Sequence, residues 1–290
     1  MASGCRDRGR NADSSGSSSS SSSAAPVAST CGLPAGQGQL SADSRPYRVD
    51  APSGSGPFPV IIQLHGYGSN AQQQALYSGL VGEGPARGYL VITPDGQGSP
   101  QRWDLIGGSD FTYIDDAIDA LPAGCANSSR TYLTGISNGS AFSAFGTCRL
   151  AHPVTAVAFV ATTLYPAACS PRPTPVLAFH GTADPVVPYA GGTVGSAGVF
   201  AGATVAPAED AMAKWAALDG CASTPTVTTV AADVTQLDWA GCAAGEAVTL
   251  DRIEGGGHTW PGAIAVPRLG ATTKSISATQ LMLDFFDAHP

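Results

Sequence analysis

The segment Gly135-Ile136-Ser137-Asn138-Gly139 fits the pattern G-x-S-x-G, and it decides the fold. It follows an apolar run at 131–134 that we expect to be a strand, and it precedes an expected helix at 140–150. A strand, a sharp turn and a helix in this order form a nucleophile elbow, which lifts a serine hydroxyl above the edge of a sheet. The segment therefore predicts Ser137 as a nucleophile.

Apolar strands alternate with helical stretches on both sides of this segment. Continuous apolar runs, typical of buried parallel strands, occur at 59–64, 89–93, 154–161, 175–179 and 247–253. Helices are expected at 111–121, 208–218 and 275–286. This alternation predicts an α/β fold with a mainly parallel central sheet and helices on both faces. We expect residues 31–290 to form one catalytic domain.

A nucleophilic serine needs a base, and the chain has five histidines. His289 is next to the last residue, and His152 follows the expected nucleophile helix, far from the carboxyl ends of the strands. His65 and His180 each end a strand but precede the expected acid. His258 follows the strand at 247–253 in a glycine-rich loop that lets an imidazole approach the serine. We therefore expect His258 to be the base.

The acid of such a site lies between the serine and the histidine in the chain. Asp184 follows the strand at 175–179, at the same sheet edge, and its carboxylate would orient the imidazole. Asp233, Asp238 and Asp251 lie in the same interval. Asp251 falls within a strand, and the other two fall in a segment without a recognisable pattern, so Asp184 is favoured.

Two backbone N–H groups are expected to form an oxyanion hole. One belongs to Asn138, directly after the nucleophile, and the other to Tyr67 in the loop after the first predicted strand. A plain glycine turn would also explain Gly66 and Gly68 in that loop.

Four blocks of sequence together resemble an esterase family that includes polyhydroxybutyrate depolymerases and feruloyl or acetylxylan esterases. They are LHGYGSN at 64–70, TGISNGS at 134–140, HGTADPVVPY at 180–189 and GGGHTWPG at 255–262. The resemblance implies an α/β-hydrolase fold, no metal or other cofactor, and Ser137, Asp184 and His258 as a catalytic triad. The chain departs from the family pattern at Ser140, where a second glycine is usual.

Four aromatic residues near these motifs are candidates for the walls of an acyl or alcohol pocket. They are Tyr67, Trp103, Tyr189 and Trp260. Trp260 is the strongest candidate because it is two residues from His258. Core packing is an equally good explanation for each of them.

Composition and charge exclude several classes of protein. Charged residues make up 12% of the chain, against roughly 25% on average, which excludes a coiled coil. The net charge of −8 argues against nucleic acid as a partner. No uncharged apolar run reaches the ~18 residues that a membrane helix needs.

The seven cysteines indicate disulfides. Cys221 and Cys242 bracket the segment between an expected helix and an expected strand, and we expect them to pair. Four others, with three possible pairings, are Cys31, Cys125, Cys148 and Cys169. Three disulfides would indicate an oxidising compartment.

Residues 1–30 are expected to be a disordered, serine-rich tether. Small residues before Cys5 resemble the cleavage site of a bacterial lipoprotein, in which Cys5 would carry a lipid. The alternative is that the sequence starts at an arbitrary position and that Cys5 has no special role.

The sequence thus predicts a secreted or cell-surface serine esterase, acting as a monomer. Its substrate would be a feruloyl or acetyl-xylan ester or a hydroxyalkanoate oligomer, with other polyesters as a side activity. One alternative is an acyltransferase on the same triad. Another is a non-catalytic, glycan-binding lipoprotein on the hydrolase scaffold.

Overall fold

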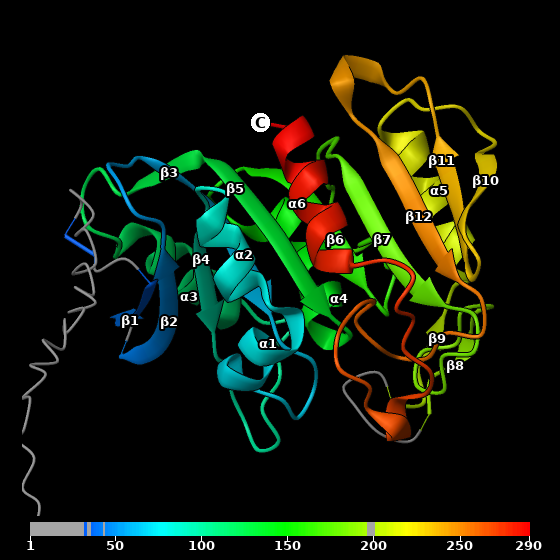
Figure 1. Ribbon diagram of the computed structural model, residues 1–290, viewed down its shortest axis with the longest axis horizontal. Coiled ribbons are helices and arrows are strands. Elements are labelled where there is room, and N and C mark those ends of the chain that lie inside the picture. Colours follow the sequence, from blue (N-terminus) through cyan, green and yellow to red (C-terminus); the bar gives the residue numbers. More distant parts are fainter. Residues whose placement is uncertain (1–31, 34–35, 43, 196–200) are drawn as a thin grey trace, which may run out of the picture.

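A ten-stranded sheet organises the part of the chain that the computed structural model describes, which is residues 32–33, 36–42, 44–195 and 201–290. The strand order is β1-β2-β4-β3-β5-β6-β7-β12-β11-β10 (Figure 1). These strands are β1 (Gly36–Ala42), β2 (Arg45–Ala51), β3 (Phe58–Leu64), β4 (Leu90–Pro94), β5 (Ala126–Ile136), β6 (Val154–Val160), β7 (Val176–Gly181), β10 (Thr226–Ala231), β11 (Val234–Trp239) and β12 (Val248–Ile253). The predicted tether, Cys5 and Cys31 lie outside the described residues.

The centre of the sheet is parallel. Strands β4, β3, β5, β6, β7 and β12 pair in parallel in that order. Each overlaps one of the predicted strands, because a strand covered on both faces has to be apolar along its whole length. The edges β1-β2 and β11-β10 are antiparallel and were not predicted. Most residues of β1 and β10 are exposed or half-buried, so these strands carry no continuous apolar run.

Helices cover both faces of the sheet (Figure 1). The helices behind it in this view are α3 (Ser109–Asp119), α4 (Asn138–Arg149) and α5 (Ala208–Leu218), and those in front are α1 (Ala71–Ser78), α2 (Leu80–Ala86) and α6 (Ala278–Ala288). Side chains alternate between the faces: Val60 and Ile62 join the core beneath α3, α4 and α5, whereas Ile61 joins the core beneath α2 and α6. The predicted α/β-hydrolase architecture is therefore confirmed.

Helices α1 and α2 were not predicted from the sequence. The helix α1 reads AQQQALYS and lacks an apolar stripe at helical spacing. It is fixed locally instead, because the Asn70 side chain accepts a hydrogen bond of 2.9 Å from the backbone N–H of Gln73. Such a cap satisfies a donor that the first turn of a helix leaves unpaired.

The parallel strands deliver the candidate residues to one edge of the sheet. Ser137 follows β5, Asp184 follows β7 and His258 follows β12, while the loop containing Tyr67 follows β3. Carboxyl ends of parallel strands share an edge, which is where ligands bind in such sheets.

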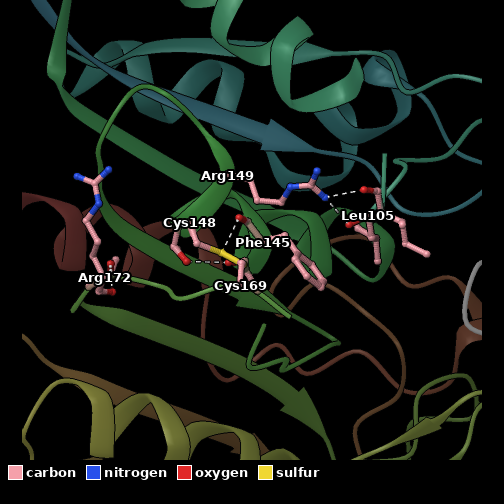
Figure 2. Close-up of a disulfide and its surroundings, with 10 residues drawn as sticks. Leu105, Phe145, Cys148, Arg149, Cys169 and Arg172 are labelled. Carbon is pink, nitrogen blue, oxygen red and sulfur yellow. Dashed lines mark hydrogen bonds between the residues drawn. A yellow bond between two sulfur atoms is a disulfide. The ribbon is translucent and has the colours of Figure 1, made fainter. Parts of the chain in front are cut away.

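Two disulfides lie within the described residues. The predicted Cys221–Cys242 pair is confirmed, and the second joins Cys148, near the end of α4, to Cys169 in the loop before β7 (Figure 2). Beside it, Arg149 donates to the carbonyl oxygens of Leu105 and Ile106 (3.1 and 2.9 Å). Cys125 is also disulfide-bonded.

None of the helices in the described ranges is both long and apolar enough to cross a lipid bilayer.

Replacing both Cys221 and Cys242 by Ser should lower the free energy of unfolding by about 3 kcal/mol, because the disulfide closes a loop with a sequence separation of 21 residues. Urea unfolding of the double variant and the oxidised wild type measures the difference. Equal unfolding midpoints for the two proteins would contradict the prediction.

Candidate active site

Ser137 occupies a strained turn between β5 and α4. Its φ of 59° and ψ of −118° lie in a region that non-glycine residues rarely adopt, which is typical of functional positions. A Cβ on Gly139 would lie 2.7 Å from the carbonyl oxygen of His65, and one on Gly135 would lie 2.8 Å from that of Leu64. Both flanking glycines are therefore needed, because the elbow passes in contact with β3.

Asp184 and His258 are hydrogen-bonded to each other. The distance between Asp184 Oδ2 and His258 Nδ1 is 2.8 Å, and the other oxygen, Oδ1, accepts from the backbone N–H groups of Val186 and Val187, both at 2.8 Å. The carboxylate itself is fully buried. These contacts fix the orientation of the imidazole and place its proton at Nδ1, so Nε2 is the ring atom left to accept a proton.

A second buried histidine also approaches the same carboxylate, which the sequence did not predict. His180 Nε2 lies 3.4 Å from Asp184 Oδ2 and 3.0 Å from the carbonyl oxygen of Val187. Both neighbours are acceptors, so the ring proton is at Nε2. Burial raises the pKa of Asp184, but hydrogen bonds from His180 and His258 outweigh burial and hold the pKa at about 2. Asp184 therefore stays ionised at neutral pH.

None of the other acidic candidates is hydrogen-bonded to His258 among the described residues. Asp251 is buried in β12, where its Oδ1 accepts from Gln236, and burial raises its pKa. Asp238 accepts from the Thr249 hydroxyl on the neighbouring strand. Asp233, on the turn between β10 and β11, accepts from the Glu254 N–H through its backbone carbonyl.

The loops after β7 and β12 are joined through their backbones. Thr182 N–H donates to the carbonyl of Ile253, and Ala183 N–H donates to that of Gly256, both at 2.9 Å. A Cβ on Gly181 would collide with the carbonyls of Gly256 and Gly257. This close contact explains Gly181 and holds Asp184 and His258 in register, while Gly257 is needed because a Cβ there would collide with the carbonyl oxygen of Leu269.

The two residues expected to form the oxyanion hole line one cavity together with Ser137. The N–H groups of Tyr67 and Asn138 have no acceptor among the described residues. A Cβ on Gly66 would lie 3.5 Å from the Cβ of Ser137, so the loop after β3 lies directly against the nucleophile. Unpaired backbone N–H groups beside a nucleophile are suited to stabilising an oxyanion.

His65 holds the loop after β3 in place. Its Nε2 accepts from the Gly96 N–H at 2.9 Å, so the proton is on Nδ1, which donates to the Gly66 carbonyl at 2.7 Å. Burial lowers the pKa of His65. His65 thus supports the loop and is not the base.

Trp103 connects this loop to the residue after the nucleophile. Its indole N–H donates to the His65 carbonyl at 2.9 Å, and its backbone N–H donates to Asn138 Oδ1 at 2.7 Å. Asn138 Nδ2 returns a bond of 3.2 Å to the Trp103 carbonyl. The Asn138 side chain therefore orients the turn, while its backbone N–H remains free.

A cavity of about 540 Å³ lies over the site and is lined by Ser137, Asn138, His258, Gly66 and Tyr67. The remaining wall is mostly apolar and includes Leu76, Ile136, Val186, Val187, Val194, Ile264, Val266 and Leu269. Its other members are Gly68, Ser69, Gln73, Gln74, Tyr77 and Arg268. The volume and lining are typical of small-molecule sites. Among the described residues, no group of three His, Cys, Asp or Glu side chains is placed to hold a metal ion.

Three of the four predicted pocket aromatics lie elsewhere. Trp103 and Trp260 are each 1% exposed, and neither they nor Tyr189 line this cavity. Their polar atoms have internal partners: Trp260 donates to the Thr279 hydroxyl, and Tyr189 donates to Glu209. The prediction that these three residues line the pocket is corrected accordingly. Tyr67, 38% exposed, does line it.

Ser140, the departure from the family pattern, is accommodated inside the fold. Its hydroxyl is buried and donates to the carbonyl of Thr162 at 2.6 Å. The serine therefore adds a contact between α4 and the end of β6.

Comparison with known proteins finds esterases. The chain is 30% identical over 275 residues to NocK of Nocardia uniformis subsp. tsuyamanensis, a protein provisionally named an esterase, and the match covers 83% of this chain and 79% of that protein. It is 29% identical over 217 residues to feruloyl esterase B of Piromyces equi, and 28% identical over 148 residues to a bifunctional acetylxylan esterase/xylanase of Neocallimastix patriciarum. These matches cover 69% and 50% of this chain.

The match spans only 39% of the length of feruloyl esterase B and 22% of that of the bifunctional protein. No family model matches the chain. Among solved structures, an acetyl xylan esterase from Aspergillus awamori superposes with a TM-score of 0.60 at 13% identity, covering 87% of this chain and 99% of that one. At that identity the superposition supports the fold alone.

The low pKa of Asp184 predicts a pH-dependent contribution to stability. The folded pKa of about 2 lies below the unfolded value of about 3.9, so the ionised carboxylate stabilises the fold above pH 4, and this stabilisation is lost as the pH falls towards 2. Asp184→Asn should lower the free energy of unfolding by about 2 kcal/mol at pH 6 and by about half as much at pH 3. Urea unfolding of both proteins at the two pH values measures this, and an unchanged difference would contradict it.

Proposed function

We propose that this chain, which belongs to the same esterase family as NocK, hydrolyses carboxylic esters through Ser137, His258 and Asp184. The observation that carries this proposal is the buried hydrogen bond between Asp184 and His258, at a cavity whose lining also contains Ser137 on its strained turn. An orienting acid, a base and a nucleophile at one cavity are the parts that acyl transfer to water needs.

The first half of the reaction forms an acyl-enzyme. His258 Nε2 takes the proton of the Ser137 hydroxyl as Oγ attacks the ester carbonyl, and the carbonyl electron pair moves onto oxygen. The N–H groups of Tyr67 and Asn138 stabilise that oxyanion. The intermediate collapses, the bond to the alcohol oxygen breaks, and His258 gives its proton to the leaving alcohol. Asp184 remains ionised and stabilises the imidazolium, as its pKa of about 2 allows.

The second half releases the acid. Water enters, His258 removes one of its protons, and the resulting hydroxide attacks the acyl carbon. The second oxyanion occupies the same place, and collapse breaks the bond to Ser137 Oγ, which recovers its proton from His258. Water is the acceptor in this proposal, whereas an acyltransferase would pass the acyl group to another hydroxyl.

For the substrate class we propose esters of plant cell-wall polysaccharides. Two relatives are named for feruloyl and acetylxylan esters, and the cavity accepts an acyl group between apolar walls. Hydroxyalkanoate oligomers are the second candidate class. The disulfides support secretion, since such bonds persist in oxidising compartments. The segment 31–290 acts in this proposal as one catalytic domain.

Ser137→Ala should reduce kcat on p-nitrophenyl acetate about 10⁴-fold or more, because no other group supplies the attacking oxygen. Ser129→Ala is the matched control, since Ser129 is exposed at the opposite end of β5. The kcat of each variant is measured from the rate of p-nitrophenol release. Activity of Ser137→Ala near that of the wild type would overturn the mechanism.

A side-by-side assay on methyl ferulate, acetyl-xylan and 3-hydroxybutyrate oligomers tests the substrate class. The expected result is the highest kcat/KM on one of the two cell-wall esters. A higher kcat/KM on the hydroxybutyrate oligomers would contradict the proposed class.

A further inference from the structure

The cavity beside Ser137 has one permanently charged side chain in its described lining, that of Arg268. No Asp or Glu lines the same space. Arg268 is exposed, and its guanidinium has no ion pair or hydrogen bond with any described residue. The cavity is thus apolar along much of its wall and carries an uncompensated positive charge.

The unpaired charge of Arg268 stands out in an acidic protein. The chain has 22 acidic residues against 14 Lys and Arg, and several of its arginines are paired with carboxylates. Arg45 bonds Asp110 at 2.8 Å, and Arg252 bonds Glu209 and Glu254 at 3.1 and 2.7 Å. A net charge of −8 also repels anions from the protein as a whole, so an anionic substrate needs a local cation at the site.

The turn that carries Arg268 is fixed to the histidine loop. Arg268 lies in the short helix Pro267–Leu269, and the His258 N–H donates to the carbonyl of Leu269 at 2.7 Å. One residue earlier, Gly257 N–H donates to the carbonyl of Ala271 at 2.8 Å. A Cβ on Gly257 would lie 2.6 Å from the Cα of Gly270, so the two segments are in direct contact. The backbone of Arg268 is therefore held at a constant position relative to His258.

We propose that Arg268 forms a carboxylate-binding subsite of this cavity and that, between two esters of otherwise similar structure, the protein favours the one with a free carboxylate near the bond that is cleaved. This inference rests on the esterase function proposed above. A guanidinium presents paired N–H donors that match the two oxygens of a carboxylate, and the apolar wall receives the hydrocarbon part of the same molecule. A neutral ester of equal size makes the apolar contacts but leaves the guanidinium unpaired.

The carboxylate can belong to the acyl group or to the alcohol group of the ester, and two matched pairs of substrates separate these sources. For the acyl side, p-nitrophenyl hemiglutarate is compared with p-nitrophenyl valerate, which has the same carbon count and no charge. For the alcohol side, the 3-hydroxybutyrate dimer is compared with its methyl ester. The measured quantity is the ratio of kcat/KM for the charged ester to that for its neutral partner.

Arg268→Gln is the test variant, and Lys214→Gln is its control. Lys214 is exposed on α5, away from the cavity lining, so its loss changes the net charge equally without touching the site. For at least one pair we expect Arg268→Gln to lower the ratio about fivefold, the range of an exposed ion pair, and Lys214→Gln to leave it at the wild-type value. Raising the salt concentration should lower the wild-type ratio and leave that of Arg268→Gln nearly constant.

Ratios for both pairs that are the same in Arg268→Gln and the wild type would overturn the subsite. An equal fall in the ratio for both variants would also overturn it, since the effect would then come from net charge. Hydrolysis of the neutral esters, with its loss in Ser137→Ala, tests the esterase function separately. If the neutral esters are cleaved through Ser137 but the ratios do not respond to Arg268, the subsite fails and the proposed function stands.

Discussion

The buried carboxylate of Asp184 is the group on which the arrangement of the site depends. It receives N–H donors from its own loop, from His180 at the end of β7 and from His258 after β12. A buried charge is stable only when its oxygens are hydrogen-bonded, so each donor has to stay in place. The loop after β7 is thereby joined to the loop after β12. The loop after β12 is in turn joined to the turn that carries Arg268, because the His258 N–H donates to the carbonyl of Leu269. One ionised group thereby orders three segments distant in the sequence.

The nucleophile side is ordered differently, by backbone contact. The elbow lies so close to β3 that side chains at Gly135 and Gly139 would collide with its carbonyls. The loop after β3 is held by the His65 ring, which accepts from the Gly96 N–H and donates to the Gly66 carbonyl. Trp103 also holds it, because its indole N–H donates to the His65 carbonyl and its backbone N–H donates to Asn138 Oδ1. Removing a bulky indole from this position would leave a void and free two loops at once. The backbone N–H groups of Tyr67 and Asn138 stay free because these contacts between the loops are made by other donors.

Much of the fold was predictable because the central strands are covered on both faces and must be apolar throughout. The exposed edge strands β1 and β10, and the glutamine-rich α1, carry no such signal and were missed. Chain order and strand ends pointed to Asp184 and His258, which the structure joins by a hydrogen bond. The supporting residues His65 and His180, and the cation Arg268, were not predicted, since their contacts arise only when separate loops meet. His65 and His180 have one feature of the sequence in common, since each stands directly before a glycine at the end of a strand. Sequence proximity misled for Trp260, whose ring turns into the core beneath α6.

The central claim is that Ser137 is a nucleophile activated by His258. Reaction of the native protein with a fluorophosphonate probe, followed by peptide mass spectrometry, tests it most directly, because the probe modifies only an activated hydroxyl. The expected result is one equivalent of label on the peptide containing Ser137 in the wild type and a large loss of labelling rate in His258→Asn. Label on a different residue, or undiminished labelling in His258→Asn, would contradict it.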